Sequence, residues 1–356
     1  MRVVLVGAGG MGKAWLSTIL ADPSVELAGV VDLDLAAAAA AVAAAGVPEV
    51  PTGRDVVDVA VRTGADAVVN VTVPQAHHPV TTAALFAGFP VLGEKPVAST
   101  VAQALSLAAA SEVSGRSFVV SQSRRYNPHV EEFRAQAAVL GPLGSLSTEF
   151  FKAPHFGGFR EEMAQPLLVD MAIHQFDLAR YLLGAEPVSV YCESWNPSWS
   201  WYAGDASAAA VFEMSSGARY TFAGSWCAPG VETSWNGSWR LSGAEGSAVW
   251  NGDDAPVLDA TGSPVAFADP GDGIAGSLAA FTAFLQDGAP FSGEVHDNVL
   301  SLAMVEAAVE SAASGSRVLV DDVLQRAYEQ ALADEERADV AAALKGWSSV
   351  REALTR

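Results

Sequence analysis

Hydrophobic runs and helical segments alternate along the first third of the chain. Five runs rich in valine and leucine are predicted to be strands, at 2–6, 26–31, 67–71, 90–92 and 117–121. The segments between them are predicted to be helices, at 10–20, 35–45, 55–62, 80–87 and 101–111. Strands that are apolar on both faces and alternate with helices indicate a parallel sheet with helices on both sides.

The pattern changes after about residue 123. Two helices are predicted first, over 129–140 and over 167–183, and the second lies between Pro166 and Gly184. Longer β-type runs follow at 188–195, 206–214, 218–226 and 238–242, with a hairpin turn at Ser215-Ser216-Gly217. Further helices are predicted over 277–285 and 299–313. This part therefore predicts a second domain with a mostly antiparallel sheet.

Length and composition agree with a globular protein of two domains. The 356 residues exceed one typical core, and half of them are hydrophobic. We expect a first domain over 1–123, a second over 124–320 and a charged helical tail over 321–356. The net charge of −21 argues against nucleic acid or an anionic membrane as partner. Solvation of an alanine-rich protein explains this acidity better than a cationic substrate does.

The two cysteines, Cys192 and Cys227, have the spacing of neither a zinc site nor a redox pair. A reducing cytoplasm fits this usage. The first strand starts at once, without a basic leader or a cleavage site, so no export signal is expected. The longest apolar run, 35–45, is shorter than the ~20 residues of a membrane span. It is predicted to be a helix with Asp34 as its N-cap.

A glycine-rich loop follows the first predicted strand and opens the first helix. Gly7, Gly9 and Gly12 match the pattern G-x-G-x-x-G, and Gly10 and Met11 complete the loop. Glycines in this context allow a tight turn and let a pyrophosphate approach backbone N–H groups at the helix N-terminus. The loop therefore predicts a dinucleotide site.

Asp32 ends the second predicted strand, at the offset expected for an acid that binds the adenosine ribose. A carboxylate there accepts hydrogen bonds from both ribose hydroxyls and repels a 2′-phosphate. No arginine occurs in the next twenty residues. The sequence therefore favours NAD over NADP. The alternative, that Asp32 only caps the next helix, is weakened because Asp34 can do so.

Four further segments carry a specific resemblance. They are Thr72-Val73-Pro74-Gln75-Ala76-His77-His78, Val91-Leu92-Gly93-Glu94-Lys95-Pro96, Arg125-Tyr126-Asn127-Pro128 and Asp170-Met171-Ala172-Ile173-His174-Gln175-Phe176-Asp177. In order and spacing the series resembles the glucose–fructose oxidoreductase, inositol dehydrogenase and rhizopine catabolism (Gfo/Idh/MocA) family over residues 1 to 320. The resemblance implies an N-terminal Rossmann domain, a C-terminal α/β domain with a large open sheet, and NAD(P)-dependent action on sugars, inositols or related polyols.

Lys95 lies after a short buried strand, at the sheet edge where ligands bind in parallel sheets. Its charge suits a developing alkoxide, whereas the plain alternative is a surface lysine. The resemblance implies that Glu94 faces the nicotinamide ribose. It also implies that Pro96, which would fix the backbone beside Lys95, is cis in some members, which a sequence alone does not show.

Asp170, His174 and Asp177 are spaced i, i+4 and i+7, on one face of the predicted helix. His174 can take the hydroxyl proton of an alcohol, with Asp170 orienting substrate or imidazole. A metal pair or a satisfied core histidine is the alternative, but a third metal ligand is not evident. The family has glycines before this helix, and Ala164-Gln165-Pro166 departs from that pattern, which leaves the substrate less certain than the chemistry.

Other residues are weaker candidates. The resemblance places Thr72, Pro74 and His78 at the cofactor and Arg125 and Asn127 at the substrate. A surface histidine at a helix N-terminus is nearly as good an interpretation of His78. A hinge held by ion pairing is an equally good interpretation of Arg125 and Asn127. Seven of nine tryptophans lie between Trp195 and Trp250. Most are expected in the sheet core or a subunit interface, with one or two stacking on a sugar.

These observations predict an NAD-dependent dehydrogenase of a sugar or cyclitol, assembled as a homodimer or homotetramer because a large open sheet needs covering. Lys95, Asp170 and His174 are the catalytic candidates, and all three are expected to touch the substrate. Two alternatives remain open. One is a non-catalytic NAD-binding regulator on the same fold, and the other is a lyase or glycosidase that uses NAD transiently.

Overall fold

The computed structural model describes residues 1–355 and divides them into two compact units. The first unit contains residues 1–123, 271–299 and the segment from 326 onward. The second contains residues 124–270 and 300–325. Each unit has its own sheet, so the sequence-based fold class, α/β with two different sheets, is confirmed. No helix among residues 1–355 is long and apolar enough to cross a membrane.

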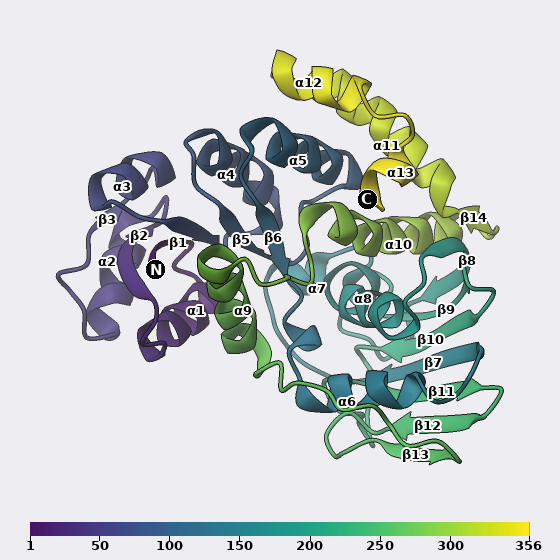
Figure 1. The fold of residues 1–356 in the computed structure, drawn as a ribbon. Helices are drawn as coiled ribbons and strands as arrows, with labels where there is room; N and C mark the ends of the chain where they lie inside the picture. Colours follow the sequence, from purple (N-terminus) through teal and green to yellow (C-terminus); the bar gives the residue numbers. More distant parts are fainter. Residues whose placement is uncertain (356) are drawn as a thin grey trace. The chain divides into compact units, whose positions relative to one another are not determined.

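The sheet of the first unit contains six strands in the order β3-β2-β1-β4-β5-β6, all parallel (Figure 1). The strands are β1 (Arg2–Val6), β2 (Glu26–Val31), β3 (Thr52–Gly53), β4 (Ala67–Asn70), β5 (Val91–Glu94) and β6 (Phe118–Ser121). The strand order reverses direction between β1 and β4. In doubly wound sheets a ligand binds at such a switch point, outside the carboxyl ends of the strands.

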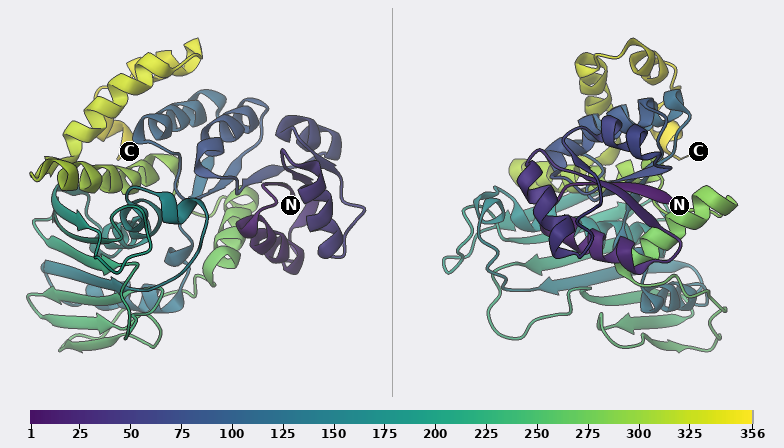
Figure 2. Two further views of the ribbon diagram at one scale, coloured as in Figure 1. Left: turned by 180° about the vertical axis from the view of Figure 1, so that it is seen from behind. Right: turned by 90° about the vertical axis from the view of Figure 1, so that its left-hand side faces the viewer.

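Helices cover both faces of this sheet, as Figure 2 shows. They are α1 (Gly10–Ala21), α2 (Leu35–Ala44), α3 (Val56–Thr63), α4 (Pro74–Phe86) and α5 (Val101–Ser114). Asp34 caps α2 as predicted, because its side chain accepts hydrogen bonds from the N–H groups of Ala36 and Ala37. Helix α4 begins six residues before the predicted start at Val80, since the helix continues through Pro79.

Later parts of the chain return to the first unit. Helix α9 (Gly273–Asp287) packs on α1, where Leu278 and Phe281 join the core around Trp15. Gly293 accepts a hydrogen bond from the Val120 N–H at the open side of β6. Helix α12 (Ala338–Lys345) packs along α5, between α11 (Val320–Asp334) and α13 (Val350–Leu354) in the sequence.

The sheet of the second unit has eight strands in the order β13-β12-β11-β7-β10-β9-β8-β14. They are β7 (Leu143–Phe151), β8 (Pro187–Trp195), β9 (Ser207–Met214), β10 (Arg219–Ser225), β11 (Ser238–Gly243), β12 (Gly246–Trp250), β13 (Val257–Ala260) and β14 (Val318–Leu319). All neighbours are antiparallel except β7 and β10, so the predicted mostly antiparallel sheet is confirmed. The predicted hairpin turn joins β9 to β10, with Gly217 at φ +86.

One face of this sheet is covered by α6 (Pro128–Ala137) and α8 (Ala172–Leu183) (Figure 1). Phe176 of α8 is fully buried, and its ring packs edge-on against Phe212 of β9 at 4.8 Å and Phe222 of β10 at 5.5 Å. The opposite face carries exposed apolar side chains, including Tyr191 and Val211. The sheet is therefore a half-covered layer with one open face.

The predicted single helix over 167–183 is wrong in its first turn. Residues Leu167–Met171 form a π-helical turn, closed by a hydrogen bond from the Ala172 N–H to the Leu167 carbonyl, before α8 begins. A π turn places one extra residue in the ring. Asp170 therefore lies in the wider π turn, whereas His174 lies in α8. The regular i, i+4 spacing on one α-helix that the sequence predicted for this pair is not present.

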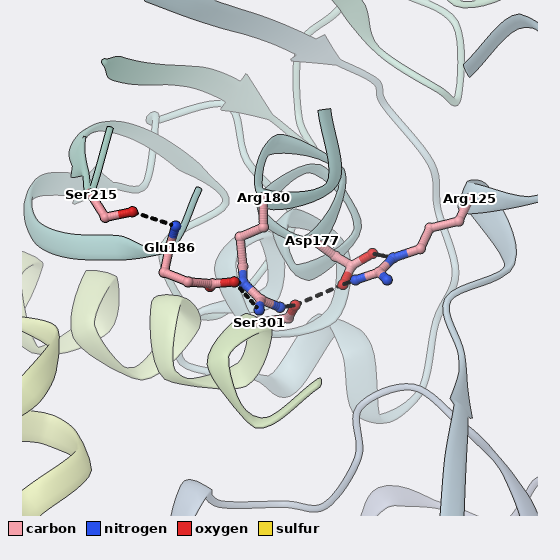
Figure 3. Close-up of polar contacts among 6 residues, drawn as sticks. All are labelled: Arg125, Asp177, Arg180, Glu186, Ser215 and Ser301. Carbon is pink, nitrogen blue, oxygen red and sulfur yellow. Dashed lines mark hydrogen bonds and ion pairs between the residues drawn. The ribbon is translucent and has the colours of Figure 1, made fainter. Parts of the chain in front are cut away.

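A buried polar network centred on Asp177 holds α8 (Figure 3). Both carboxylate oxygens of Asp177 accept hydrogen bonds from Arg125, at 2.7 Å each, and Oδ1 also accepts one from Ser301 at 2.7 Å. Ser301 lies in α10 (Val295–Ser314) and accepts a hydrogen bond from Arg180, which pairs with Glu186 at 2.6 Å. The Ser215 hydroxyl accepts a hydrogen bond from the Glu186 N–H at 3.0 Å.

Removing one partner of a buried ion pair leaves the other charge uncompensated. We expect Asp177→Asn to lower the free energy of unfolding by about 3–5 kcal/mol. Urea denaturation followed by circular dichroism measures the change. Glu213→Gln, which breaks the surface pairs with Arg219 and Arg317, is the matched control and should cost no more than about 1 kcal/mol. Equal effects of the two substitutions would contradict this account.

A second charged cluster ties three segments of the first unit together. The His296 ring lies 2.9 Å from Glu294 and 3.1 Å from Glu112 of α5, and Trp347 donates its indole N–H to Glu112 at 3.1 Å. Burial lowers the pKa of His296, but hydrogen bonds and charges of Glu294 and Glu112 outweigh burial and raise the pKa above its ordinary value.

A raised pKa in the folded protein means that the folded state binds the proton more tightly. The stabilisation by His296 is therefore complete below the unfolded pKa of about 6.5 and is lost as pH rises through the folded value. We expect the difference in unfolding free energy between the wild type and His296→Gln to be larger at pH 5.5 than at pH 8.5. Glu112→Gln should reduce this dependence on pH, and a difference that grows with pH would refute the assignment.

Candidate functional site

The glycine loop after β1 is shaped by close backbone packing at two of its glycines. Gly7 has φ +107, and a Cβ there would meet the Val71 carbonyl oxygen at 2.8 Å. A Cβ on Gly12 would lie 2.0 Å from the Gly7 carbonyl oxygen. In contrast, a Cβ on Gly9 or Gly10 would meet nothing within 4 Å. Packing explains Gly7 and Gly12, whereas Gly9 and Gly10 leave an open approach to the N-terminus of α1.

The carboxylate of Asp32 is held at the edge of this loop. It accepts a hydrogen bond from the Ala8 N–H at 2.7 Å and another from the Asp34 N–H at 2.9 Å. Asp32, the residue directly after β2, therefore also holds the glycine loop in place. The exposed Arg54 donates to the Leu33 carbonyl at 3.1 Å. Arg54 lies 22 residues after Asp32, beyond the twenty residues that contain no arginine, and the β2–β3 pairing brings it close to the end of β2.

The end of β4 is joined to the segment around Lys95 through His77. The two ring nitrogens of His77 lie 2.7 Å from the Pro96 carbonyl oxygen and 3.0 Å from the Thr72 carbonyl oxygen. Burial, the largest contribution, lowers the pKa of His77, and the charge of Lys95 acts in the same direction. The neutral ring donates to one of these carbonyls. Sequence reasoning missed His77, although it belongs to the quoted motif.

Its neighbour His78 has a different environment. The Nε2 atom of His78 lies 2.9 Å from the hydroxyl of Ser106 on α5, and this hydroxyl donates to Glu335 at 2.5 Å. Pro74 is the first residue of α4, where its fixed φ suits the helix start. Thr72 donates its hydroxyl to Asn70 at 2.7 Å. The structure therefore gives His78, Pro74 and Thr72 local structural contacts.

Glu94 and Lys95 occupy the end of β5. Glu94 is buried and accepts a hydrogen bond from the indole N–H of Trp15 on α1 at 2.8 Å and one from the Lys95 N–H at 3.1 Å. Burial raises the pKa of Glu94 above its usual range. The Lys95–Pro96 peptide is cis. The segment before Lys95 is therefore anchored to the helix that follows the glycine loop, a contact that the sequence did not reveal.

In the second unit, Asp170 and His174 lie on consecutive turns and are both half-buried. Asp170 forms an ion pair with Arg160 at 2.6 Å. Arg160 belongs to the short helix α7 (Phe159–Glu162), and its guanidinium also lies over the Phe159 ring at 4.8 Å. Arg160 was missed in the sequence because it follows a glycine-rich loop without a recognisable pattern.

The two proposed substrate contacts near residue 125 have structural partners. Arg125 is buried in the bidentate pair with Asp177. Asn127 caps α6, because its side-chain oxygen accepts a hydrogen bond from the His129 N–H at 2.8 Å. The ion-paired reading of Arg125 therefore agrees with the geometry.

The tryptophans divide into two groups. Trp226, Trp239 and Trp250 are buried at the sheet, whereas Trp195, Trp199 and Trp235 are 45–62% exposed. Trp235 contacts Phe150 and Phe156, and the Lys152 ammonium lies 5.2 Å from its ring centre. Trp235 thus presents an aromatic surface near charged groups of the second unit. No group of three potential metal ligands occurs among residues 1–355.

Two family models match the chain. Residues 1–122 match the model for the oxidoreductase family with an NAD-binding Rossmann fold. Residues 136–249 match the Gfo/Idh/MocA C-terminal domain. The chain belongs to the Gfo/Idh/MocA family of oxidoreductases. The predicted family and NAD as cofactor are thereby confirmed.

Curated relatives fall into two ranges of coverage. An uncharacterized protein of Sinorhizobium fredii, y4oX, is 28% identical over 91% of this chain and 97% of its own length. Inositol 2-dehydrogenase 4 of Saccharopolyspora erythraea is 34% identical, over 53% of this chain and 56% of its own length. The match to that dehydrogenase thus spans little more than half of it, and its substrate is not transferred by similarity.

Solved structures share the fold. An oxidoreductase from Agrobacterium radiobacter, in complex with NAD+, L-tartaric acid and magnesium, superposes with a TM-score of 0.79 at 20% identity. The alignment covers 90% of this chain and 99% of that one. A putative myo-inositol dehydrogenase from Sinorhizobium meliloti gives 0.73 at 22% identity, over 90% and 99% of the two chains. At these identities the likeness concerns the fold.

Two glycine substitutions separate cofactor binding from packing. We expect Gly12→Ala to destabilise the first unit by several kcal/mol and to abolish NAD binding, because its Cβ would lie 2.0 Å from a backbone oxygen. Gly9→Ala should leave the melting temperature within about 2 °C but weaken NAD binding at least tenfold, since its methyl group occupies the approach to the helix N-terminus. Isothermal titration with NAD and thermal unfolding measure both. Unchanged NAD affinity in Gly9→Ala would exclude this approach.

Proposed function

We propose that the chain is an NAD-dependent dehydrogenase that oxidises a secondary alcohol of a sugar or cyclitol. The observation that carries the proposal is the occurrence, in one family member, of an open glycine loop together with Lys95, Asp170 and His174. Gly9 and Gly10 leave room for a pyrophosphate, and Asp32 offers a carboxylate to the ribose. Bound NAD would supply the acceptor for the hydride that leaves the alcohol carbon.

His174 is the proposed general base. As the C–H hydride leaves the alcohol carbon, the hydroxyl proton must pass to a base, and the carbon–oxygen bond becomes a carbonyl. An imidazole suits this role because its ordinary pKa is close to neutral pH. Lys95 is proposed to stabilise the negative charge that develops on the same oxygen. Both side chains belong to the motifs quoted for the family.

Asp170 is proposed to orient the substrate or His174. Its pairing with Arg160 at 2.6 Å gives Arg160 a positioning role, because the guanidinium fixes the carboxylate. The short helix α7 then controls where Asp170 points. The carboxylate held in this way is proposed to accept hydrogen bonds from substrate hydroxyls.

We also propose that the open face of the second sheet forms a homo-oligomer interface. Tyr191 of β8 and Val211 of β9, which are partners in the sheet, are 38% and 40% exposed on that face. Together with the surrounding strands they form an apolar surface of a kind that subunit contacts bury. A dimer or tetramer measured by light scattering supports the interface, and a monomer at micromolar concentration rejects it.

Substitution of the two catalytic candidates tests the proposed chemistry. We expect Lys95→Met and His174→Ala each to lower kcat by about 10²–10⁴ while NAD affinity changes less than about tenfold. The measurement is NADH absorbance across a panel of sugars and inositols, with NAD binding measured separately. Lys345→Met, at an exposed position of α12, is the control and should keep full activity.

Full turnover in either catalytic variant would overturn the assignment of that residue. Tight NAD binding with no NADH across the panel would favour a non-catalytic regulator. Bound NADH that is formed but never released would favour a lyase or glycosidase that oxidises and re-reduces its substrate.

A further inference from the structure

Most cations of the second unit that are at least partly buried are matched by a carboxylate. Arg125 pairs with Asp177, Lys152 with Glu232, Arg160 with Asp170, and Arg180 with Glu186, at 2.6–2.9 Å. This pattern is expected, because a charge that is removed from water is costly unless it is paired. The environment of Arg124, in the same unit, can be compared with these pairs.

Arg124 departs from this pattern. Its guanidinium donates hydrogen bonds to the Trp235 carbonyl and to the Asn236 side-chain oxygen, the latter at 3.0 Å, and approaches the Met171 sulfur at 3.9 Å. All three acceptors are neutral, and among residues 1–355 no carboxylate pairs with Arg124. Burial lowers the pKa of Arg124 to about 10, so the group remains charged at neutral pH.

The location of Arg124 connects it to the proposed substrate groups of the same unit. Met171, which its Nη2 atom approaches, follows Asp170 directly and precedes His174 by three residues. Trp235, whose backbone carbonyl accepts a hydrogen bond from Arg124, is 45% exposed. Arg124 therefore contacts both the Asp170–His174 segment, at Met171, and the partly exposed Trp235-Asn236 segment.

We propose that Arg124 binds a carboxylate of the substrate, so that the sugar or cyclitol alcohol belongs to an acid such as a uronic or aldonic acid. The inference rests on the proposed dehydrogenase function and specifies its substrate class. A planar guanidinium matches a carboxylate through two parallel hydrogen bonds. Nη1 donates to Trp235 and Asn236, so the pair proposed to bind the carboxylate is Nε and Nη2, of which Nη2 has only the weak acceptor Met171 sulfur at 3.9 Å.

The other cations near Trp235 do not replace Arg124 in this role. Lys152 lies over the Trp235 ring but is paired with Glu232, and the Ala153 N–H donates to the same carboxylate at 3.1 Å. Arg160 is paired with Asp170. A second anion at either would have to displace a carboxylate, whereas an anion at Arg124 completes a pair.

The first test compares acids with neutral molecules of the same shape. Binding of D-glucuronate and D-galacturonate to the NAD-loaded enzyme is measured by titration calorimetry and tryptophan fluorescence, beside D-glucuronamide and D-galacturonamide. We expect at least one acid to bind at least tenfold more tightly than its amide. Acids that bind no better than their amides would overturn the proposal, and tighter binding of D-glucose 6-phosphate than of either acid would replace the carboxylate by a phosphate.

The second test uses substitutions at Arg124. Arg124→Gln should remove the preference for the acid, with a loss of thirtyfold or more in its affinity and less than threefold in that of the amide. Arg124→Lys should retain part of the preference, because the charge remains but the planar fork is lost. Arg219→Gln, which removes a surface arginine of β10, is the control and should leave both affinities unchanged.

Stability separates ligand binding from a structural role. A ligand-binding arginine without a counter-charge predicts a melting temperature of Arg124→Gln within about 2 °C of the wild type. A large loss of stability with the acid preference intact would make Arg124 a structural residue and overturn the inference. Acid preference lost in Arg124→Gln without any NADH formation would sustain this inference while rejecting the dehydrogenase. NADH formed equally from acids and amides would support the dehydrogenase and reject the proposed role of Arg124.

Discussion

The second unit depends on one buried carboxylate, Asp177. It receives hydrogen bonds from Arg125 at the start of the unit and from Ser301 of α10, while it is itself part of α8. Three segments distant in sequence thus meet at one charge. Because Asp177 lies one turn after His174, the same contacts that compensate its charge also set the rotation of α8. The orientation of His174, the proposed base, therefore depends on the contacts that compensate the buried charge of Asp177.

The first unit positions its chemistry by backbone contact rather than by charge. Gly12 packs on the Gly7 carbonyl, and His77 links the carbonyl oxygens of Thr72 and Pro96. Glu94 is bound to Trp15 of α1, so the glycine loop, the helix after it and the Lys95 segment form one connected edge. This edge lies at the carboxyl ends of β1, β4 and β5, where the strand order reverses. The sheet order therefore explains why short motifs far apart in the sequence belong together.

The sequence predicted most elements of the first unit because its strands are continuous apolar runs and its helices have clear ends. It did not predict β7, in which Leu146, Thr148 and Phe150 face inward while the intervening positions are polar and partly glycine or serine. Only pairing with β10 and β11 makes that segment a strand. The π turn at Asp170 was equally hidden, since its spacing fits an ordinary helix. Partners such as Arg160 and Trp15 depend on tertiary folding, which no local pattern encodes.

The first unit is built from three separated stretches of chain, and this has a consequence for how the protein is made. Residues 271–299 and the segment from 326 onward pack on helices formed by the first 123 residues. During synthesis, the early sheet must therefore wait until Phe281 has been made to pack near Trp15, and until Trp347, more than 200 residues after residue 123, has been made to bind Glu112. Contacts so distant in sequence slow folding and leave apolar surface exposed in the meantime. The first unit is therefore expected to complete its folding only after the end of synthesis, when chaperones can bind its exposed apolar surface.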